Sequence, residues 1–144
     1  MKKIYLGADH GGFNLKEYIK IVLCELKIPF EDKGAFIKEM DDFPVFAEKV
    51  CINVRDKESK GILICTTGIG MSIAANKMRG IRAALVDNVS FTEMARKHND
   101  ANVLVLSGKT LKSRIKPILL AFFNTKPSRA KRYKERNKQI EKLR

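Results

Sequence analysis

The chain has 144 residues, of which 44% are hydrophobic and 31% charged, and this predicts one globular domain over residues 1–144 rather than two. No apolar run approaches the ~18 residues of a membrane span, and no secretory signal precedes the first apolar segment, which excludes a membrane-spanning protein and favours the cytoplasm. The formal net charge of +13 indicates an anionic partner, such as a phosphorylated metabolite, a nucleic acid or a membrane surface.

The N-terminal part of the chain predicts two strands, each followed by a helix. Residues 4–8 form a short apolar run, and the apolar residues over 15–26 recur at spacings of three and one, which is one face of a helix. Pro29 falls within a second strand expected near residues 28–32. The helix expected over 44–54 has a proline in its first turn, where a missing N–H costs nothing.

The remaining elements continue this alternation, and their strands are continuous apolar runs. Such runs predict a parallel sheet that is covered by helices on both faces, that is, an α/β fold. In such a sheet a ligand binds at the carboxyl ends of the strands, near a switch in strand order. We expect strands at 61–65, 81–86 and 103–106, and helices at 73–77, 90–97, 111–123 and from Pro127 onwards.

Several polar residues follow predicted strands and could line this edge of the sheet. The basic composition and this placement together favour a small anionic ligand. These residues are Asp9, His10, Cys65, Thr66, Thr67 and Asp87.

The segment from Cys65 to Ser72 joins a buried strand to a helix. Its glycines, Gly68 and Gly70, let the backbone approach a ligand, and the helix start offers unpaired N–H groups for a phosphate or an enediolate oxygen. The glycines could instead serve only a tight turn. No Gly-Lys-Ser/Thr follows and the dinucleotide fingerprint is incomplete, so no nucleotide cofactor is expected.

The three cysteines have no CxxC spacing, and with only two histidines they give no support for a zinc site. Free thiols fit a reducing compartment. Cys65 is either a small apolar filler or, beside a helix N-terminus, a base or nucleophile. Cys24 and Cys51 fall on predicted helices and are expected to be packing residues.

His10 and His98 are the two histidines, and each has two interpretations. Either could be a surface or capping residue, or could serve as a general acid near neutral pH. Arg132 and Arg136 are four residues apart, so on a helix they share a face that suits phosphate. Because residues 126–144 hold nine Lys and Arg against two Glu, this face could also be simply solvated.

Four segments together resemble the ribose-5-phosphate isomerase B family, which includes the galactose-6-phosphate isomerase subunits. The likeness runs from Lys2 to about Ile140. The combination of Cys-x-Thr-Gly-x-Gly-x-Ser with His-Asn-Asp is specific to this family. The segments are Gly7–Gly12, Gly61–Lys77, Gly80–Ala83 and His98–Leu104.

The resemblance implies a Rossmann-like three-layer α/β/α fold with five parallel strands, and a homodimer or dimer of dimers. It implies interconversion of ribose 5-phosphate and ribulose 5-phosphate, in the pentose phosphate pathway, without metal or organic cofactor. The site is then at a subunit interface, with the basic helix over 126–144 packed on the partner.

The resemblance also implies roles for particular residues. Cys65 carries the proton between C1 and C2, while His98 opens the sugar ring with help from Thr67. The backbone from Gly68 through Gly70 to Ser72 holds the enediolate oxygen. The expected contacts to sugar hydroxyls come from Asp9 and Asn99, and those to phosphate from His10, Lys109, Arg132 and Arg136.

Three residues depart from the pattern of the family. Tyr133 stands where many members have a histidine, Lys109 where members often have an arginine, and Thr66 where some have glycine. A lysine is a point charge rather than a fork, so it grips phosphate differently. The galactose-6-phosphate isomerase subunits typically lack the cysteine at position 65, so Cys65 favours the pentose-phosphate branch.

Three alternative functions remain open at this point. One is an isomerase of a six-carbon sugar phosphate, such as allose or galactose 6-phosphate. Another is a non-catalytic sugar-phosphate sensor on the same fold. The third is a nucleic-acid-binding module, which the net charge suggests but the lack of aromatics other than Tyr133 in the basic tail disfavours.

Overall fold

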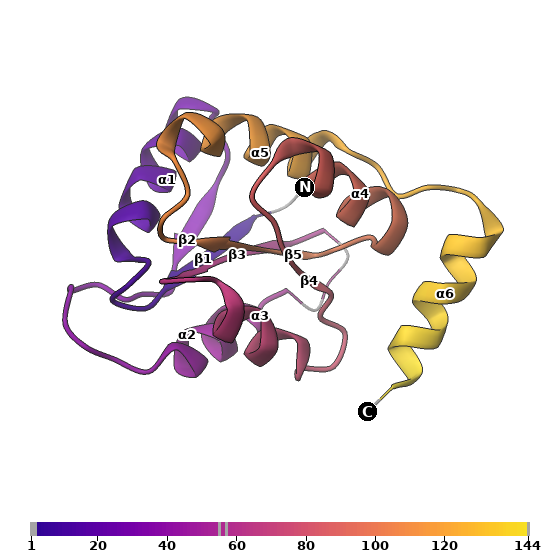
Figure 1. Cartoon of the computed structure of the whole chain (residues 1–144), viewed down its shortest axis with the longest axis horizontal. Coiled ribbons are helices and arrows are strands. Elements are labelled where there is room, and N and C mark those ends of the chain that lie inside the picture. Colours follow the sequence, from indigo (N-terminus) through magenta and orange to yellow (C-terminus); the bar gives the residue numbers. More distant parts are fainter. Residues whose placement is uncertain (1–2, 55, 57, 144) are drawn as a thin grey trace.

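A computed structural model of the chain describes residues 3–54, 56 and 58–143, in which a parallel sheet lies between two layers of helices (Figure 1). The strands are β1 Ile4–Ala8, β2 Phe30–Asp32, β3 Lys60–Cys65, β4 Ala83–Leu85 and β5 Val103–Ser107. The helices are α1 Phe13–Glu25, α2 Phe43–Cys51, α3 Ile69–Asn76, α4 Val89–Asn99, α5 Lys112–Asn124 and α6 Lys131–Lys142. The predicted α/β class with five parallel strands is confirmed.

The strand order is β2-β1-β3-β5-β4, and every neighbouring pair is parallel. From β1 the chain crosses to one edge of the sheet, and from β3 it crosses to the other. The order therefore reverses between β1 and β3, and a crevice is expected where the carboxyl ends of these two strands meet.

The central strand β3 sends alternate side chains to opposite faces of the sheet. Ile62 and Ile64 pack in the core with α1 and α5, whereas Leu63 and Cys65 pack in the core with α2 and α3. All four are buried. Burial on both faces is why the sequence here is continuously apolar rather than alternating.

The elements at the margins differ from the sequence prediction in their bounds. Strands β2 and β4 are shorter than predicted, because each is an edge strand that pairs with one neighbour only. Helix α2 ends at Cys51 rather than near residue 54. Helix α6 begins at Lys131, not at Pro127, because the preceding segment runs along α4, where the Ser128 amide donates to the Lys97 carbonyl at 2.8 Å.

One charged residue in the core was not anticipated from the sequence. The Lys16 side chain of α1 is fully buried, and its Nζ donates to Asp32 at 2.5 Å and to Glu17 at 2.9 Å. Burial by itself raises the pKa of Asp32, but hydrogen bonds from Lys16 and Lys20 bring it below its usual value. This network ties β2 to α1 and fixes the start of the loop that leads to α2.

Within the described residues, no helix combines the length and the apolar character that crossing a bilayer requires.

Candidate active site

Two candidate residues lie at the reversal in strand order: Asp9 directly follows β1, and Cys65 ends the neighbouring strand β3. Asp9 is 5% exposed, and its Oδ1 accepts a hydrogen bond from the Gly12 amide at 3.0 Å. The carboxylate thereby closes the turn between β1 and α1. The Asp9 amide in turn donates to the Ile64 carbonyl, at the end of β3. The two strand ends are thus joined directly.

The turn after β3 brings the backbone amide of Gly68 to the Cys65 sulfur. Gly68 has a φ of +80°, which a residue with a side chain rarely adopts, and its amide donates to Cys65 Sγ at 3.2 Å. Helix α3 starts one residue later, so the amides of Gly70 and Met71 have no intrahelical acceptor. Cys65 is 5% exposed. One amide therefore donates to the sulfur, and two amides without intrahelical acceptors follow at the start of α3, where a developing negative charge is stabilised.

The other two thiols lie in contrasting surroundings. Cys51 on α2 is fully buried, and burial raises its pKa to about 12, so it stays protonated as a packing residue. Cys24 is exposed on α1. The expectation that Cys24 packs in the core was therefore wrong, because it falls outside the stripe of Leu15, Ile19, Val22 and Leu23 that faces the sheet.

The turns after β1, β3 and β5 touch one another at the carboxyl ends of these strands. A side chain added to Gly11 would lie 1.9 Å from Thr66 Oγ1, and one added to Gly108 would lie 2.3 Å from the Gly11 carbonyl oxygen. Gly108 also donates its amide to the Cys65 carbonyl at 2.7 Å. The Thr66 side chain is accommodated because it packs over Gly11, which has no side chain of its own.

His10 lies beside this crevice and is held by a carboxylate that sequence reasoning missed. Asp41 Oδ1 accepts hydrogen bonds from both the His10 amide, at 2.9 Å, and Nδ1, at 3.0 Å. The hydrogen bond from Asp41 raises the pKa of His10 above its ordinary 6.5, and the charge of Asp9 adds to this effect. Asp41 comes from the loop before α2, where no local pattern signals the contact.

Asp9, His10 and Asp41 also form the one group among the described residues that could share a metal ion, with ligand atoms within 4.8 Å of one another. Two of these three side chains are bonded to each other, since Asp41 accepts a hydrogen bond from His10. The third, Asp9, accepts a hydrogen bond from the Gly12 amide. His10 is therefore paired with a carboxylate on its Nδ1 side.

Three further predicted residues lie at the same edge of the sheet. Thr67 is exposed, and its Oγ1 accepts from the Ile69 amide at 3.2 Å. Ser72 lies in the first turn of α3, where its amide donates to the Gly68 carbonyl. Lys109 is exposed just beyond β5. One group of candidate residues thus lies at the carboxyl ends of the strands, and we call it the Cys65 half. Its members are Cys65, Thr67, the glycine turn, Asp9, His10 and Lys109.

His98 and Asn99 lie at the opposite end of the strands from Cys65, near the point where β5 begins. They end α4, three residues before β5 begins, and the Asn102 carbonyl accepts from the Gly61 amide at the start of β3. Gly61 and Cys65 are four residues apart along β3, so the two ends of this strand are separated by about 13 Å. Within one chain, therefore, the structure does not bring His98 to Cys65.

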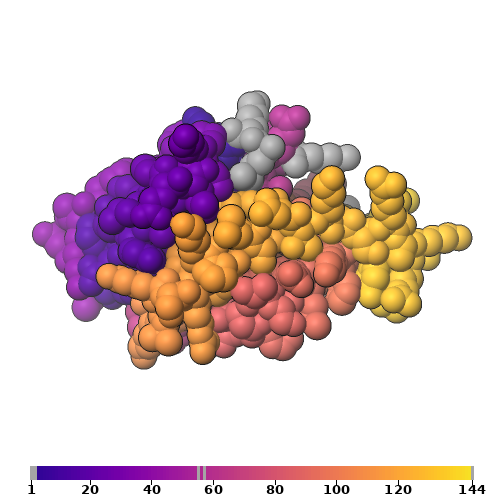
Figure 2. Space-filling view, turned by 90° about the horizontal axis from the view of Figure 1, so that it is seen from above, coloured from indigo at the N-terminus to yellow at the C-terminus, as the bar shows by residue number. Residues whose placement is uncertain are grey.

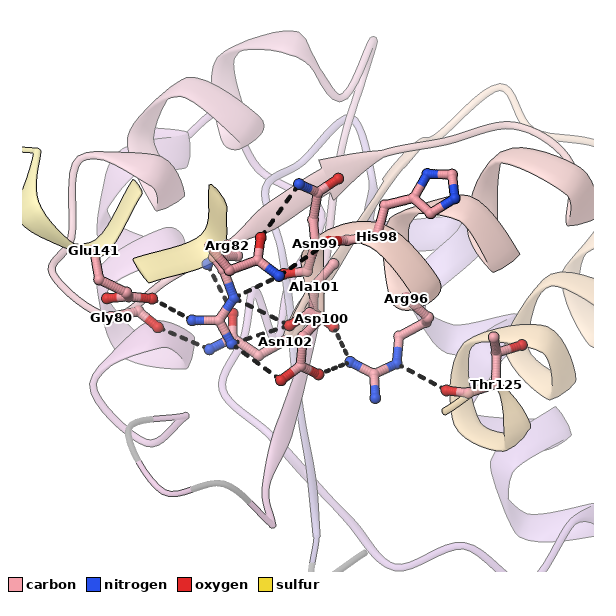
Figure 3. Close-up of polar contacts among 11 residues, drawn as sticks. Gly80, Arg82, Arg96, His98, Asn99, Asp100, Ala101, Asn102, Thr125 and Glu141 are labelled. Carbon is pink, nitrogen blue, oxygen red and sulfur yellow. Dashed lines mark hydrogen bonds and ion pairs between the residues drawn. The ribbon is translucent and has the colours of Figure 1, made fainter. Parts of the chain in front are cut away.

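Two arginines fix the end of α4, as Figure 3 shows. Arg82 donates to the carbonyls of Asn99 at 2.9 Å and Asp100 at 3.0 Å, while Arg96 donates to Asp100 Oδ1 at 2.6 Å and to the Ala101 carbonyl at 2.7 Å. Asp100 closes the helix with a φ of 46°. Cations on the last carbonyls suit the negative end of a helix dipole, and here they hold His98 and Asn99 in place.

Helix α6 packs on this corner through polar and aromatic contacts. The Tyr133 ring stacks on the His98 ring, with centroids 4.4 Å apart and planes 9° apart, and Asn137 Nδ2 donates to the His98 carbonyl at 2.9 Å. Arg132 and Arg136 are exposed on the same helix. We call these residues, with Asn99, the His98 half; sequence reasoning missed Tyr133 and Asn137 as part of it.

Helix α6 stands apart from the two helical layers, and Figure 2 shows its residues as a separate lobe at one end of the molecule. None of its residues is buried. A cleft of about 1130 Å³ lies between its C-terminal end and edge strand β4, lined by Arg79, Ile81, Ala84, Ile140 and Leu143 among others. The His98 half therefore borders an open space.

The sequence matches the family described as Ribose/Galactose Isomerase over residues 4–140. It is 44% identical to ribose-5-phosphate isomerase B of Escherichia coli over 112 residues, which are 77% of this chain and 75% of that protein. It is 45% identical to ribose-5-P isomerase B of Listeria innocua over 105 residues, 72% of this chain and 71% of that protein.

Solved structures agree with the sequence comparison. A ribose 5-phosphate isomerase from Thermotoga maritima superposes with a TM-score of 0.92 at 40% identity, covering 98% of both chains. Ribose-5-phosphate isomerase B from Mycoplasma genitalium, solved with bound ribulose-5-phosphate, has a TM-score of 0.89 at 34% identity and covers 96% of this chain and 93% of that one.

Proposed function

The chain belongs to the ribose/galactose isomerase family, and we propose that it interconverts ribose 5-phosphate and ribulose 5-phosphate within pentose phosphate metabolism. Sugar-phosphate isomerase is the activity that its relatives share by name. The observation that carries the finer proposal is the Cys65 sulfur beside the Gly68 amide, at the start of α3. Its three free thiols suit the cytoplasm as the compartment.

The reaction begins with the ring form of the aldose. His98, assisted by Thr67, transfers a proton to the ring oxygen as the bond from C1 breaks, which gives the open-chain aldehyde. The phosphate is gripped by His10 and Lys109 from one side and by Arg132 and Arg136 from the other. Binding energy from the phosphate then holds the reacting carbons in place.

Cys65 then acts as the base. Its thiolate takes the proton from C2, the C–H electron pair forms the C1=C2 double bond, and the carbonyl electrons move to O1. The amides of Gly70 and Met71 stabilise this enediolate, each donor being worth about 3 kcal/mol. A proton passes from O2 to O1, Cys65 returns its proton to C1, and the C2 carbonyl forms. No oxidant and no cofactor enter this balance.

We infer that a second copy of the chain completes each site. The His98 half lies at the opposite end of the strands from Cys65, so one chain cannot apply both halves to a single sugar. The residues concerned are His98, Asn99, Arg132 and Arg136. The cleft between α6 and β4 offers room for the partner. Leu85 on β4 and Phe91 and Met94 on α4 are exposed apolar residues, which a homodimer would cover.

The activity is tested by a coupled assay across five- and six-carbon aldose phosphates, using wild type, Cys65→Ala and Cys24→Ala. We expect ribose 5-phosphate to be the best substrate, and Cys65→Ala to lose about 10³-fold in kcat. Cys24→Ala removes an exposed thiol far from the crevice and should leave kcat unchanged. A folded Cys65→Ala protein with normal turnover would defeat the proposal, and preference for galactose or allose 6-phosphate would redirect it.

The shared site is tested by complementation. Cys65→Ala and His98→Gln are each expected to be inactive alone. When the two are co-expressed with different tags, a mixed dimer contains one site with both residues intact, so random pairing should restore about a quarter of the wild-type activity. Purified mixed dimers that stay inactive would show that the two residues do not meet across an interface.

A further inference from the structure

Three side chains, His98, Tyr133 and Arg132, contact one another where α6 meets α4. The His98 ring lies against the Tyr133 ring at 4.4 Å, nearly parallel, and on α6 the Arg132 guanidinium lies 4.8 Å from the centre of the same tyrosine ring. Arg132 Nη2 also donates to Tyr133 Oη at 3.2 Å. One aromatic ring thus contacts both an imidazole and a guanidinium.

The stack is part of a two-point clamp on His98. Asn137 follows Tyr133 by four residues, so the two share a face of α6. Tyr133 contacts the ring of His98 and Asn137 donates to its carbonyl at 2.9 Å. Side chain and backbone of His98 are therefore both held by α6, although the histidine belongs to α4.

A parallel stack controls the direction in which the His98 ring nitrogens point. The imidazole nitrogens lie in the plane of the ring, so a neighbour on the face leaves them free. Among the described residues, neither His98 ring nitrogen makes a hydrogen bond. The stack therefore fixes the plane in which these nitrogens can donate a proton, without occupying them.

The same ring restrains Arg132. A guanidinium carries five N–H donors in a fixed fork, and only one of its nitrogens is bonded to Tyr133. The contact with the ring and this bond restrain the guanidinium, and its other donors remain for an oxyanion. Arg136 lies one turn further along α6 and is exposed.

We propose that Tyr133 is a positioning residue that sets the planes of the His98 imidazole and the Arg132 guanidinium together, and so couples ring opening to the grip on phosphate. This rests on the proposed isomerase function. Tyr133 touches neither the reacting carbons nor the phosphate in this scheme. It acts through its two neighbours, and in the dimer it serves the Cys65 half of the other chain.

The test compares Tyr133→Leu, which removes the aromatic face, with Tyr133→Phe, which keeps the stack and removes the hydroxyl. Lys134→Gln, on the next residue of α6, is the matched control. Two rates are measured over a range of substrate concentrations: conversion of ribose 5-phosphate, and deuterium exchange at C1 of ribulose 5-phosphate in D₂O. The second needs no ring opening, because the 5-hydroxyl of ribulose 5-phosphate is esterified and cannot close a furanose ring.

We expect Tyr133→Leu to lower kcat for ribose 5-phosphate about tenfold and to affect C1 exchange by less than about threefold. Its KM should rise in both assays, because Arg132 is released. Tyr133→Phe should keep kcat and raise KM only. Equal losses in both rates, or no loss in either, would mean that Tyr133 has a structural role alone and would overturn the proposal.

A signal that needs no activity tests the stack itself. The chain has two histidines, so the carbon-bound protons of the His98 ring can be assigned by NMR with a His10→Gln variant. Stacking shifts these protons upfield, and Tyr133→Leu should move them back, whereas Lys134→Gln should not. An unchanged shift in Tyr133→Leu would overturn the inference. Wild-type protein that converts no ribose 5-phosphate would instead refute the proposed function, and the coupling with it.

Discussion

The Cys65 half and the His98 half differ in how much of the fold surrounds them. The first is formed by three strand ends that touch, with Cys65 and Asp9 each 5% exposed. The second rests on α6, which has no buried residue and is held by a ring stack, a few hydrogen bonds and an ion pair. A buried turn is rigid because the core fixes it, whereas an exposed helix is rigid only where its partners hold it.

This contrast predicts that function and folding separate when α6 is removed. Deleting residues 126–144 takes away Arg132, Tyr133 and Arg136 but none of the buried core, so the sheet should still fold. We expect isomerase activity to fall by about 10³-fold or more, with cooperative thermal unfolding retained. Retention of activity within tenfold of wild type would show that the Cys65 half works without the other half.

Two glycines with the same backbone conformation sharpen the comparison. Gly68 and Gly80 both have φ near +80°, so alanine at either should cost about 1–2 kcal/mol of folding free energy. At Gly68 the new methyl would also lie 2.4 Å from the Leu85 side chain, whereas at Gly80 nothing lies within 4 Å. We expect Gly68→Ala to lose about 100-fold in kcat through a displaced turn.

Gly80→Ala is the control for backbone strain alone, and its kcat should stay close to wild type. Thermal unfolding measures the stability cost of each variant and a ribose 5-phosphate assay measures the functional cost. Similar kcat losses in both variants would mean that strain, rather than packing around Cys65, determines the effect.

The pH dependence of phosphate binding tests the histidine contact of the Cys65 half. Asp41 raises the pKa of His10, so the imidazolium that attracts phosphate persists to higher pH and is lost as pH rises through the raised value. In Asp41→Asn the positive charge of His10 should be lost at lower pH than in wild type. KM should therefore rise several-fold already near pH 7. Asp42→Asn, whose side chain makes no capping bond, should follow the wild-type profile.

Substrate phosphate also titrates near pH 6, but it does so equally in all three proteins. The difference between their KM profiles therefore reports His10. Superimposable profiles for Asp41→Asn and wild type would show that His10 does not contact the phosphate as a cation.

The same contrast explains what the sequence could predict. Strands β1, β3 and β5 lie where their apolar runs indicated, and the Cys65 turn is local: strand, glycines and helix follow one another. The His10–Asp41 pair depends on a loop that folds back on β1, and the Tyr133–His98 stack joins two helices separated by β5 and α5. Lys16 was missed because its charge argues against the core, and the carboxylates of Asp32 and Glu17 make its burial tolerable.

The smallest effect is expected at the ion pair between Arg82 and Glu141, which links α6 to the loop before β4. Its side chains are 20% and 39% exposed, and exposed pairs contribute about 0–1 kcal/mol. Arg82 also keeps its bonds to the carbonyls of Asn99 and Asp100 when Glu141 is neutral. Glu141→Gln should therefore change kcat for ribose 5-phosphate by less than about twofold, measured at low and high salt. If it lowered kcat as much as Tyr133→Leu, the ion pair rather than the stack would orient α6, and the His98 half would be held by charge at its far end.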